Sequence, residues 1–576
     1  MRYRKLWYII LLAARILAAV SPAYIHPDEY FQGPEIAAGD IFQIDVLRTW
    51  EFTPTSPVRS IVPIYLFTGT PLVVLKLLTA LCAQLGWSIP VTGKQMFYAN
   101  RLFMVLATLL IDICVVRAIS RLYPKVQLQA TRLLLASSSC LIVFHTHTFA
   151  NSFASITLAI CFDLLSAIEA KAQTAACKLA CVSWWLGVAL TLGTFTHVSF
   201  PMFALPVGLI ALLLLARAKS YKGAVCLAAG GLLAAIAIVI ADSVYFQTAK
   251  FVNGKVSGTL TLTVLNNVLY NSDRGNLATH GIHPWYNHLV VSTPVLFGPL
   301  AVLAIARLWS FIKTLRSQTD VKCTLIAAGL SAGSGLVLLS MVPHQEPRFL
   351  VPMMAPLVIC TWRFHRVVPA YFWKLWVLFN AAIFVGYGVL HQAGVTPAVD
   401  FVSQTSVLPR ITCHFGTGND HIECMAANGN YTEHRLQVTS KVFAFAAFMA
   451  PRHLLAQPTH SEWQAQAEIH DLISVEDSSV QEKLSQSVHV SCKQAQTAAS
   501  GSILAKQTTS GHFERTLLVV PSSLDIRRVV PADSNYSVVE LYSYAPHVNF
   551  DHIGEILLHP IQRTKLRVLV ICDPSR

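Results

Sequence analysis

Long apolar stretches separated by short polar loops dominate the first two thirds of the chain. A helix needs about 20 mainly apolar residues to cross the hydrocarbon layer of a membrane. Eleven stretches approach this length, and we expect each to be a membrane-spanning helix: residues 7–24, 99–119, 130–148, 152–169, 178–197, 199–216, 223–246, 287–307, 323–342, 348–363 and 371–391. The pattern therefore predicts an α-helical polytopic membrane protein.

A further apolar stretch, residues 61–86, contains Pro63, Pro71 and Lys76. We expect it to lie in or on the membrane without crossing it, because the basic residues favour eleven spans. With eleven spans, every loop rich in Lys and Arg falls on the cytoplasmic side, as the positive-inside rule requires. A crossing at 61–86 would place several of these loops on the wrong face. The first stretch also resembles a cleaved signal peptide, but an uncleaved anchor better positions the polar residues after it.

The composition changes at about residue 392, where Gln, Ser, Thr, His and Asn become common. Short apolar runs at 516–520 and 566–570 predict strands. We therefore expect a transmembrane region, residues 1–395, with luminal loops at 25–98 and 247–286, followed by a small luminal α/β domain, residues 396–576. A polar stretch near 455–510 is a candidate flexible insertion. The domain holds glycosylation sequons at Asn430 and Asn535, and cysteines whose pairing stays open: Cys413, Cys424, Cys492 and Cys572.

The composition of the whole chain agrees with a membrane protein. Hydrophobic residues make up 54% and charged residues 13% of the 576 residues, and the mean hydropathy is +0.52. The formal net charge of +13 does not indicate a nucleic-acid partner, because basic cytoplasmic loops account for an excess of Lys and Arg in a membrane protein.

Chemically versatile side chains gather in the loops of the predicted luminal face. Asp28 and Glu29 stand next to each other where the first span ends, and charged groups at this depth are costly unless they are solvated, paired or functional. The same face carries further polar side chains, which are His26, Gln32, His280, His283, His344, Glu346 and Arg348. This segregation predicts one site, built from several loops over a helical bundle.

Several of these stretches resemble a known family. His26-Pro27-Asp28-Glu29-Tyr30-Phe31-Gln32 is similar to the HPDE signature of the endoplasmic-reticulum mannosyltransferases that use dolichyl-phosphate mannose, which belong to the GT-C class. Asp242-Ser243-Val244-Tyr245-Phe246 and His344-Gln345-Glu346-Pro347-Arg348-Phe349 are similar to two later elements of that family. The stretch from Asn266 to Pro284 resembles the branch that adds the fourth, α-1,2-linked mannose to the glycosylphosphatidylinositol precursor. His197 and Ala154 depart from the family pattern, which has arginine and often glutamate there.

The resemblance implies an inverting mannosyl transfer at a luminal site of the endoplasmic reticulum membrane. The acceptor hydroxyl has to lose a proton, and a carboxylate is the natural base. Asp28 is the first choice; Glu29 is the alternative base or an acceptor contact. The leaving phosphate needs positive charge, for which Arg348 and His344 are candidates. Contacts to the donor phosphate or to the substrates are expected from a larger set, which is His26, Gln32, His280, His283, His344, Glu346 and Arg348.

Other interpretations of these residues stay open. Asp28 and Glu29 are also compatible with a solvated pair at a helix end, and Arg348 with a structural pair to Glu346. The sequence requires no cofactor, and the spacing of His280 and His283 matches zinc sites poorly, although an ion beside Asp28 is not ruled out. The expected partners are the lipid bilayer, dolichyl-phosphate mannose and a glycosylphosphatidylinositol acceptor, with no nucleic acid.

Three other functions compete with this prediction. A transporter or lipid flippase would carry acids at mid-depth and inverted repeats, which the sequence does not display. A scaffold subunit would not need so many polar motifs on one face. The strongest rival is a sister mannosyltransferase that acts on an N-glycan precursor or on an earlier glycosylphosphatidylinositol intermediate.

Overall fold

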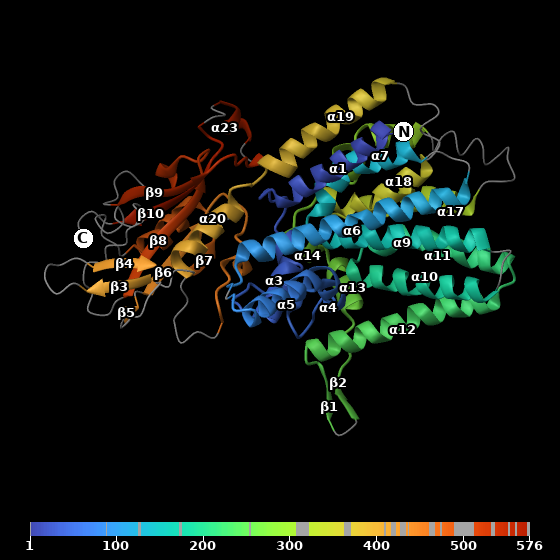
Figure 1. Cartoon of the computed structure of the whole chain (residues 1–576), viewed down its shortest axis with the longest axis horizontal. Coiled ribbons are helices and arrows are strands. Elements are labelled where there is room, and N and C mark those ends of the chain that lie inside the picture. Colours follow the sequence, from blue (N-terminus) through green and yellow to red (C-terminus); the bar gives the residue numbers. More distant parts are fainter. Residues whose placement is uncertain are drawn as a thin grey trace.

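The structure is a computed structural model, in which the chain combines a helical bundle with a mixed β-sheet at one end of the bundle (Figure 1). We call this end of the bundle the sheet end. The N-terminus lies toward the opposite end (Figure 1). The described residues are 2–87, 89–124, 128–171, 176–252, 255–306, 322–361, 370–407, 411–415, 422–426, 434–435, 437–459, 467–472, 475–488, 512–530, 536–550, 553–558 and 562–572.

The bundle is built from apolar helices of very different lengths. They are α1 (Arg2–Val20), α6 (Gly93–Leu122), α7 (Gln129–Ser137), α8 (Ser139–Ile142), α9 (Ala150–Lys171), α10 (Ala176–Thr196), α11 (Phe200–Arg217), α12 (Tyr221–Tyr245), α15 (Thr293–Phe297), α17 (Cys323–Ser340), α18 (Met354–Cys360) and α19 (Ala370–Val385). The α9 helix packs against α6, α10, α11 and α17, and its apolar side chains form the centre of the main core. Helices at the periphery, such as α12 and α19, leave most of their apolar side chains uncovered, as lipid-facing helices do.

The expected count of eleven spans is not confirmed. Within the described residues, eight helices are long and apolar enough to cross a membrane, or nine if the bent pair His288–Phe297 and Pro299–Ala306 forms one span. The expected spans at 7–24 and 348–363 correspond to shorter apolar helices, Leu6–Val20 and Pro347–Cys360. The chain is a multi-pass membrane protein, and the count of eleven spans stays a prediction.

The expected span at 130–148 is broken between α7 and α8. Ser138 has an extended backbone, and the N–H group of Ser139 donates to the Asn380 side chain. The buried Arg15 donates to the carbonyl oxygen of Leu135 just before the break. Neighbouring polar side chains therefore satisfy the backbone groups that the break exposes, which is how an interrupted helix is tolerated at membrane depth.

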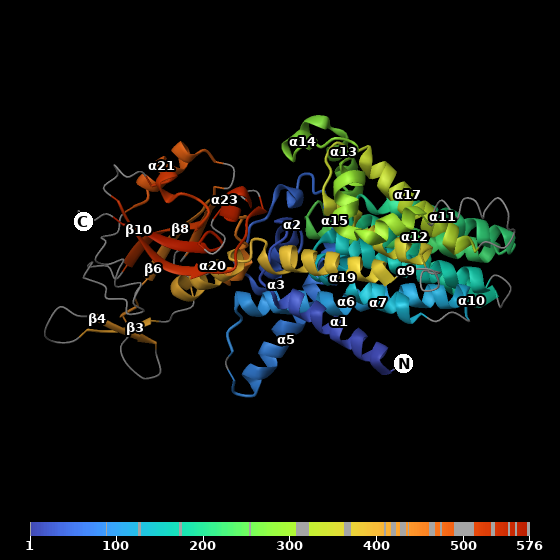
Figure 2. The ribbon, with the colours of Figure 1, turned by 90° about the horizontal axis from the view of Figure 1, so that it is seen from above.

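Residues 61–86 form α4 (Ile61–Ile64), the π-helix η2 (Tyr65–Gly69) and α5 (Thr70–Gln84). Their length and composition are also those of a spanning helix, and they are one of the eight. Figure 2 nevertheless shows α5 leaving the sheet end at a steep angle to the rest of the bundle. Leu77, Leu78 and Leu81 are exposed along it. That this stretch does not cross stays a prediction, which the direction of α5 supports.

Short elements gather toward the sheet end of the bundle (Figure 2). They are α2 (Asp28–Phe31), α3 (Pro34–Phe42), η1 (Trp50–Phe52), η3 (Phe144–Thr146), α13 (Thr263–Ser272), α14 (Arg274–Thr279), η4 (His288–Ser292), η5 (Pro347–Met353) and η7 (Gly386–Leu390). Figure 2 shows α2 and α3 between the helices and the sheet, and α13 and α14 to one side. The hairpin of β1 (Ala249–Val252) and β2 (Lys255–Gly258) follows α12.

The remaining elements form the α/β region. Its helices are α20 (Val395–Val402), η8 (Ser403–Val407), η9 (Arg452–Leu455), α21 (Asp477–Ser485), η10 (Ile526–Arg528) and α23 (Ile553–Leu558), and its strands are β3 (Ile411–Phe415), β4 (Ile422–Ala426), β5 (His434–Arg435), β6 (Gln437–Ala444), β7 (Ala467–Asp471), β8 (His512–Pro521), β9 (Ser537–Tyr544) and β10 (Leu566–Cys572). The main sheet has the order β7-β6-β8-β10-β9, and β6 pairs in parallel with β7 and β8. The strands predicted at 516–520 and 566–570 are confirmed as parts of β8 and β10.

The two faces of the sheet bury different clusters. One face carries Val442, Leu517 and Val568 and packs with Tyr30 and Phe31 of α2. The other face packs against α21. This cluster extends from the sheet through α20 to the motif at residues 26–32, which the sequence did not predict.

Several predicted features of this region are covered only in part. The suggested insertion near 455–510 contains β7 and α21, and its remaining part lies largely outside the described residues. The positions Asn430, Asn535 and Cys492 also lie outside them. Cys413 stands opposite Cys424 in the register of β3 and β4, and Cys572 is disulfide-bonded. The division of the chain at residue 395 stays a prediction.

Candidate active site

The two acids of the first motif point into different surroundings. Asp28 and Glu29 are consecutive residues of α2, and consecutive side chains on a helix do not share a face. The Asp28 side chain is 24% exposed, whereas Glu29 is completely buried. A one-residue step in the sequence therefore separates an accessible carboxylate from a sealed one.

Glu29 connects α2 to the helical bundle through an ion pair with α6. Its Oε1 accepts a hydrogen bond of 2.8 Å from Arg101 on α6, which also donates to the carbonyl oxygen of Ala23. His147 lies 3.8 Å from its other oxygen. Burial raises the pKa of Glu29 to about 7, although Arg101 acts in the opposite direction. The pair holds the loop before α2 against α6, beneath the site.

Asp28 belongs to a charged cluster centred on Arg348. The Nη1 atom of Arg348 lies 2.5 Å from Oδ2 of Asp28, and its Nε donates to Glu346. His26 accepts a hydrogen bond from the backbone N–H of Asp28, and its Nε2 lies 3.6 Å from Glu346. Burial would raise the pKa of Asp28, but Arg348 and then His26 outweigh it, so this pKa is lowered. The arginine is therefore held between two ionised carboxylates.

His344 adds a second positive charge. Its Nδ1 lies 2.9 Å from the carbonyl oxygen of Gly281, and its Nε2 lies 2.8 Å from Oε1 of Glu346. Both neighbours accept hydrogen bonds, so both ring nitrogens have to donate, which requires the imidazolium form. Burial lowers the pKa of His344, but the bonds to Glu346 and Gly281 outweigh burial and raise it.

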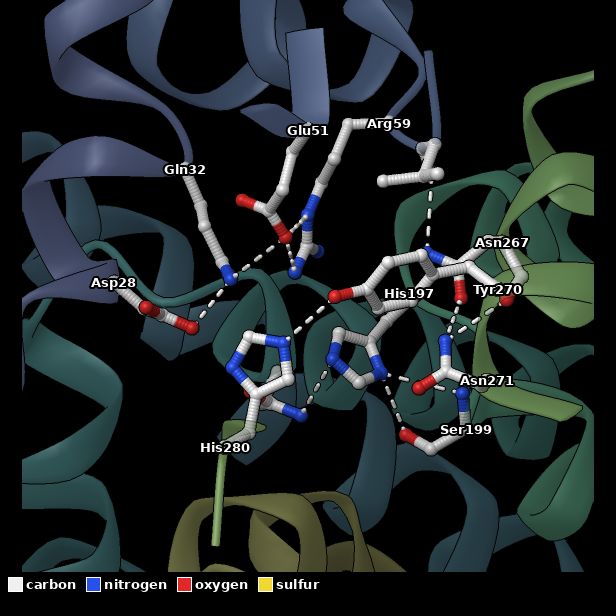
Figure 3. A network of polar contacts seen from close by, with 12 residues as sticks. Asp28, Gln32, Glu51, Arg59, His197, Ser199, Asn267, Tyr270, Asn271 and His280 are labelled. Carbon is white, nitrogen blue, oxygen red and sulfur yellow. Dashed lines mark hydrogen bonds and ion pairs between the residues drawn. The ribbon is translucent and has the colours of Figure 1, made fainter. Parts of the chain in front are cut away.

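The segment that joins α3 to α4, residues 43–60, supplies two charged residues that the sequence did not reveal. We call this segment the first loop. Gln32 donates to Asp28 and also to Oε1 of Glu51, at 3.3 Å (Figure 3). Arg59 donates to the same Glu51 oxygen at 2.9 Å. The signal available in the sequence was weak: Glu51 and Arg59 are the last charged residues before the apolar stretch that starts at residue 61.

Residues 263–286, which include α13 and α14, close the site from the other side. The side-chain amides of Asn266 and Asn267 donate to the carbonyl oxygens of Pro57 and Val58, which joins α13 to the first loop. The hydroxyl of Tyr270 lies 3.0 Å from Nε2 of His280 (Figure 3).

The histidine pair of this loop joins it to the charged cluster. The ring centroids of His280 and His344 lie 5.8 Å apart. His283 accepts a hydrogen bond from the backbone of Gln345. The structure thus gathers all the predicted site residues except Glu29 into one network.

The two residues that depart from the family pattern, His197 and Ala154, are both buried. His197 is buried, with Nδ1 2.7 Å from the Ser199 hydroxyl and Nε2 3.4 Å from the Asn151 amide (Figure 3). It lines a small cavity together with Arg59 and Asn267. Ala154 is fully buried in the main core.

Asp242 is a structural residue at the end of α12. Its carboxylate accepts hydrogen bonds from the Ser60 hydroxyl, the Ile61 backbone and the Thr263 hydroxyl, at 3.0, 2.9 and 3.1 Å. One side chain therefore joins α12, the first loop and the start of α13.

Fold and site together define a multi-pass membrane enzyme, whose charged site lies at one end of a helical bundle. Residues 6–427 match the model of the Alg9-like mannosyltransferase family. The chain belongs to this family and is a mannosyltransferase.

Curated relatives cover most of the chain. GPI mannosyltransferase 4 of Aspergillus oryzae is 31% identical over 553 residues, which are 95% of this chain and 93% of that protein. GPI alpha-1,2-mannosyltransferase 4 of Homo sapiens is 32% identical, over 72% of this chain and 74% of that protein. Among solved structures, ArnT from Cupriavidus metallidurans bound to undecaprenyl phosphate matches with a TM-score of 0.42 and 14% identity, covering 70% of this chain and 65% of that one.

Proposed function

We propose that this chain adds the fourth, α-1,2-linked mannose to a glycosylphosphatidylinositol precursor, with dolichyl-phosphate mannose as the donor. The site would face the lumen of the endoplasmic reticulum, and the bundle would be of the GT-C type. The names of the fungal and human relatives support the acceptor, and that of the human relative supports the linkage. The single observation that carries the proposal is the accessible Asp28 carboxylate paired with Arg348.

Asp28 acts as the base. The acceptor hydroxyl attacks the anomeric carbon of the donor mannose, the bond from that carbon to the phosphate oxygen breaks, and the hydroxyl proton passes to Asp28. A direct displacement of this kind inverts the anomeric configuration and needs one base, without a nucleophilic carboxylate on the enzyme. The lowered pKa keeps Asp28 ionised before the reaction. The buried Glu29 has a positioning role instead.

Arg348 and His344 receive the leaving phosphate. Arginine binds two phosphate oxygens at once, and a second cation nearby stabilises the charge that develops as the phosphate departs. Glu346 contacts both side chains, and so it orients them.

Binding of the donor also raises the pKa of the Asp28 carboxyl group. Arg348 contacts Asp28 and Glu346. A phosphate that draws Arg348 toward itself weakens the contact with Asp28, and the loss of a positive neighbour raises the pKa of a carboxyl group. Asp28 therefore becomes a stronger base when the donor is in place.

The lipid chain of the donor fits an apolar cavity on the same element as Arg348. The cavity is lined by Met353 and Leu357, which follow Arg348 along η5 and α18, and by Leu325 and Leu336 of α17. An isoprenoid chain there would extend from the phosphate into the bundle, which explains why a reaction at one end of the bundle uses a membrane-embedded protein.

A transfer assay in microsomes tests the proposal. Microsomes from cells that lack their own fourth mannosyltransferase would receive this chain, dolichyl-phosphate mannose and a three-mannose glycosylphosphatidylinositol precursor. The expected product carries one more mannose, which an α-1,2-mannosidase removes. The matched acceptor is an N-glycan precursor with free mannose termini. Transfer to that precursor alone would contradict the proposal and assign the chain to the sister activity.

A further inference from the structure

A closed circuit of contacts joins the charged cluster to a group of aromatic side chains. Each consecutive pair in the circuit is in contact through a hydrogen bond, an ion pair or ring packing, or is adjacent in the chain. It runs through Asp28, Gln32, Glu51, Trp50, Tyr270, His280, His344, Glu346 and Arg348, and returns to Asp28. The charged residues form one arc of this circuit, and Trp50, Tyr270 and His280 form the facing arc, which we call the aromatic platform.

The aromatic platform is ordered and yet open to solvent. The rings of Trp50 and Tyr270 stack with centroids 4.2 Å apart and planes inclined by 26°. The Tyr270 hydroxyl lies 3.0 Å from His280, which fixes the orientation of both rings. Trp50 is nevertheless 43% exposed. Aromatic surface that is held in place but left uncovered is typical of a binding site.

The chemistry of the platform suits a sugar ring. A hexose has an apolar face of C–H groups and a rim of hydroxyls, and rigid amphipathic rings such as Trp and Tyr match both at little cost in conformational entropy. Glu51 follows Trp50 in the chain, and Figure 3 shows Asn267 and Asn271 near Tyr270, so these side chains supply hydrogen-bonding groups for the hydroxyls. The cations that suit a phosphate lie on the other arc of the circuit.

We infer that Trp50, Tyr270 and His280 bind the terminal mannose of the acceptor glycan. Bound there, the sugar lies between the platform and the charged arc, so one of its hydroxyls can approach Asp28. Gln32 and Glu51 connect the platform to Asp28 and fix their relative positions. This inference rests on the proposed function, because it assumes a mannose-bearing acceptor.

The rival explanation is that these rings anchor the protein at the membrane interface, where Trp and Tyr are common. An interfacial anchor would affect both lipid substrates and the amount of protein, without selectivity. Trp285 provides a matched control. It is 70% exposed, it packs edge-on against Tyr286, and it stands outside the circuit.

Steady-state kinetics in microsomes, with each substrate varied at saturation of the other, distinguish the two explanations. Trp50→Ala should raise the KM for the three-mannose glycolipid about tenfold, as expected for the loss of one aromatic contact. The KM for dolichyl-phosphate mannose should change less than about twofold by the same reasoning. Trp50→Phe should retain most of the acceptor affinity, and Trp285→Ala should leave both constants unchanged.

Trp50→Leu separates stacking from folding, because it keeps apolar volume without an aromatic face; it should also raise the acceptor KM. An unchanged acceptor KM in Trp50→Ala, or an equal rise in both KM values, would contradict the inference that the aromatic platform binds the acceptor mannose. If the wild type does not use the three-mannose glycolipid at all, the proposed function fails instead. The same comparison on whichever mannose acceptor it does use then tests the platform alone.

Discussion

Asp28 and Glu29 show how strongly a role depends on the surroundings of a side chain. Asp28 contacts an arginine that a substrate phosphate can also reach, whereas Glu29 is paired with Arg101 in a sealed space. Either acid has the chemistry of a base. Of the two, only Asp28 is partly exposed, which is why we propose it as the base.

The substitution Glu29→Gln tests the positioning role. It leaves the Arg101 guanidinium buried without a counter-ion, and breaking a buried pair in this way costs roughly 3–5 kcal/mol. We expect a clearly lower thermal stability of the detergent-solubilised protein. Asp28→Asn is the matched control and should change stability little, because Arg348 retains Glu346. A Glu29→Gln protein with wild-type stability and no activity would favour Glu29 as the base.

The charged pair of His344 and Glu346 predicts a pH dependence of stability. The pKa of His344 is raised by folding. Its contribution is therefore complete below the unfolded-state pKa, about 6.5, and is lost as the pH rises through the higher folded-state pKa. The difference in thermal stability between the wild type and His344→Gln should shrink from pH 6 to pH 8. A difference that grows over this range would contradict the cationic form.

The sequence identified the charged arc of the site except for Glu51, and it identified only His280 of the aromatic arc. Asp28, Glu346 and Arg348 stand in compact motifs whose residue types indicate their chemistry. Trp50 and Tyr270 meet only because Asn266 and Asn267 bind the loop at Pro57 and Val58, more than two hundred residues earlier. The burial of Glu29 was equally hidden, since it depends on where Arg101 lies.

At the scale of elements, α10 and α12 pack with their backbones in direct contact. A Cβ atom at Gly187 would lie 2.1 Å from the carbonyl oxygen of Leu227, and one at Gly230 would lie 2.3 Å from that of Trp184. Small residues allow such close approach between membrane helices. The contact fixes α12, whose end carries Asp242 and so positions the first loop and α13.

Gly230→Ala should therefore destabilise the protein and reduce transfer together. The added methyl group forces the two helices apart, which typically costs about 1–3 kcal/mol. Gly208→Ala on α11 is the matched control, because a Cβ atom there meets only the Leu190 side chain, at an ordinary contact distance of 3.7 Å. Thermal unfolding and the transfer rate should be measured for both variants. Equal effects of the two substitutions would contradict the packing argument.

Hydropathy predicted the positions of the apolar segments better than it predicted whether each one forms a continuous crossing helix. The break at Ser138 depends on Asn380 and Arg15, which come from other helices and satisfy the freed backbone. The direction of α5 likewise differs from that of the bundle helices, although its apolar composition resembles theirs. Apolar length alone could not distinguish a crossing helix from either of these arrangements.

At the scale of the whole molecule, the α/β region supports the site from behind. Glu35 of α3 accepts hydrogen bonds from the backbone and the Nδ1 atom of His453, at 3.1 and 3.0 Å, and from the backbone of Leu47. The Tyr24 hydroxyl donates to the carbonyl oxygen of Met449. The elements that carry Asp28 are therefore fixed between the bundle and the sheet.

The substitution Glu35→Ala should weaken the contact between α3 and the α/β region. It leaves buried donors of His453 and Leu47 without an acceptor, at a cost of roughly 1–3 kcal/mol for each. We expect a lower melting temperature and a lower transfer rate. Glu468→Ala removes a similar but exposed contact with His470 and should change neither quantity, since surface pairs contribute little. A Glu35→Ala protein as active as the wild type would show that the α/β region does not support the site.

The central claim is that Asp28, held beside Arg348, takes the proton of the acceptor hydroxyl. The most direct test is the single-turnover rate of Asp28→Asn with saturating dolichyl-phosphate mannose and three-mannose glycolipid, at equal amounts of folded protein. The amide keeps the size of the side chain but cannot accept the proton, so we expect the rate to fall at least about a hundredfold, with both substrates still bound. A rate within about threefold of the wild type, less than 1 kcal/mol in the barrier, would contradict the claim.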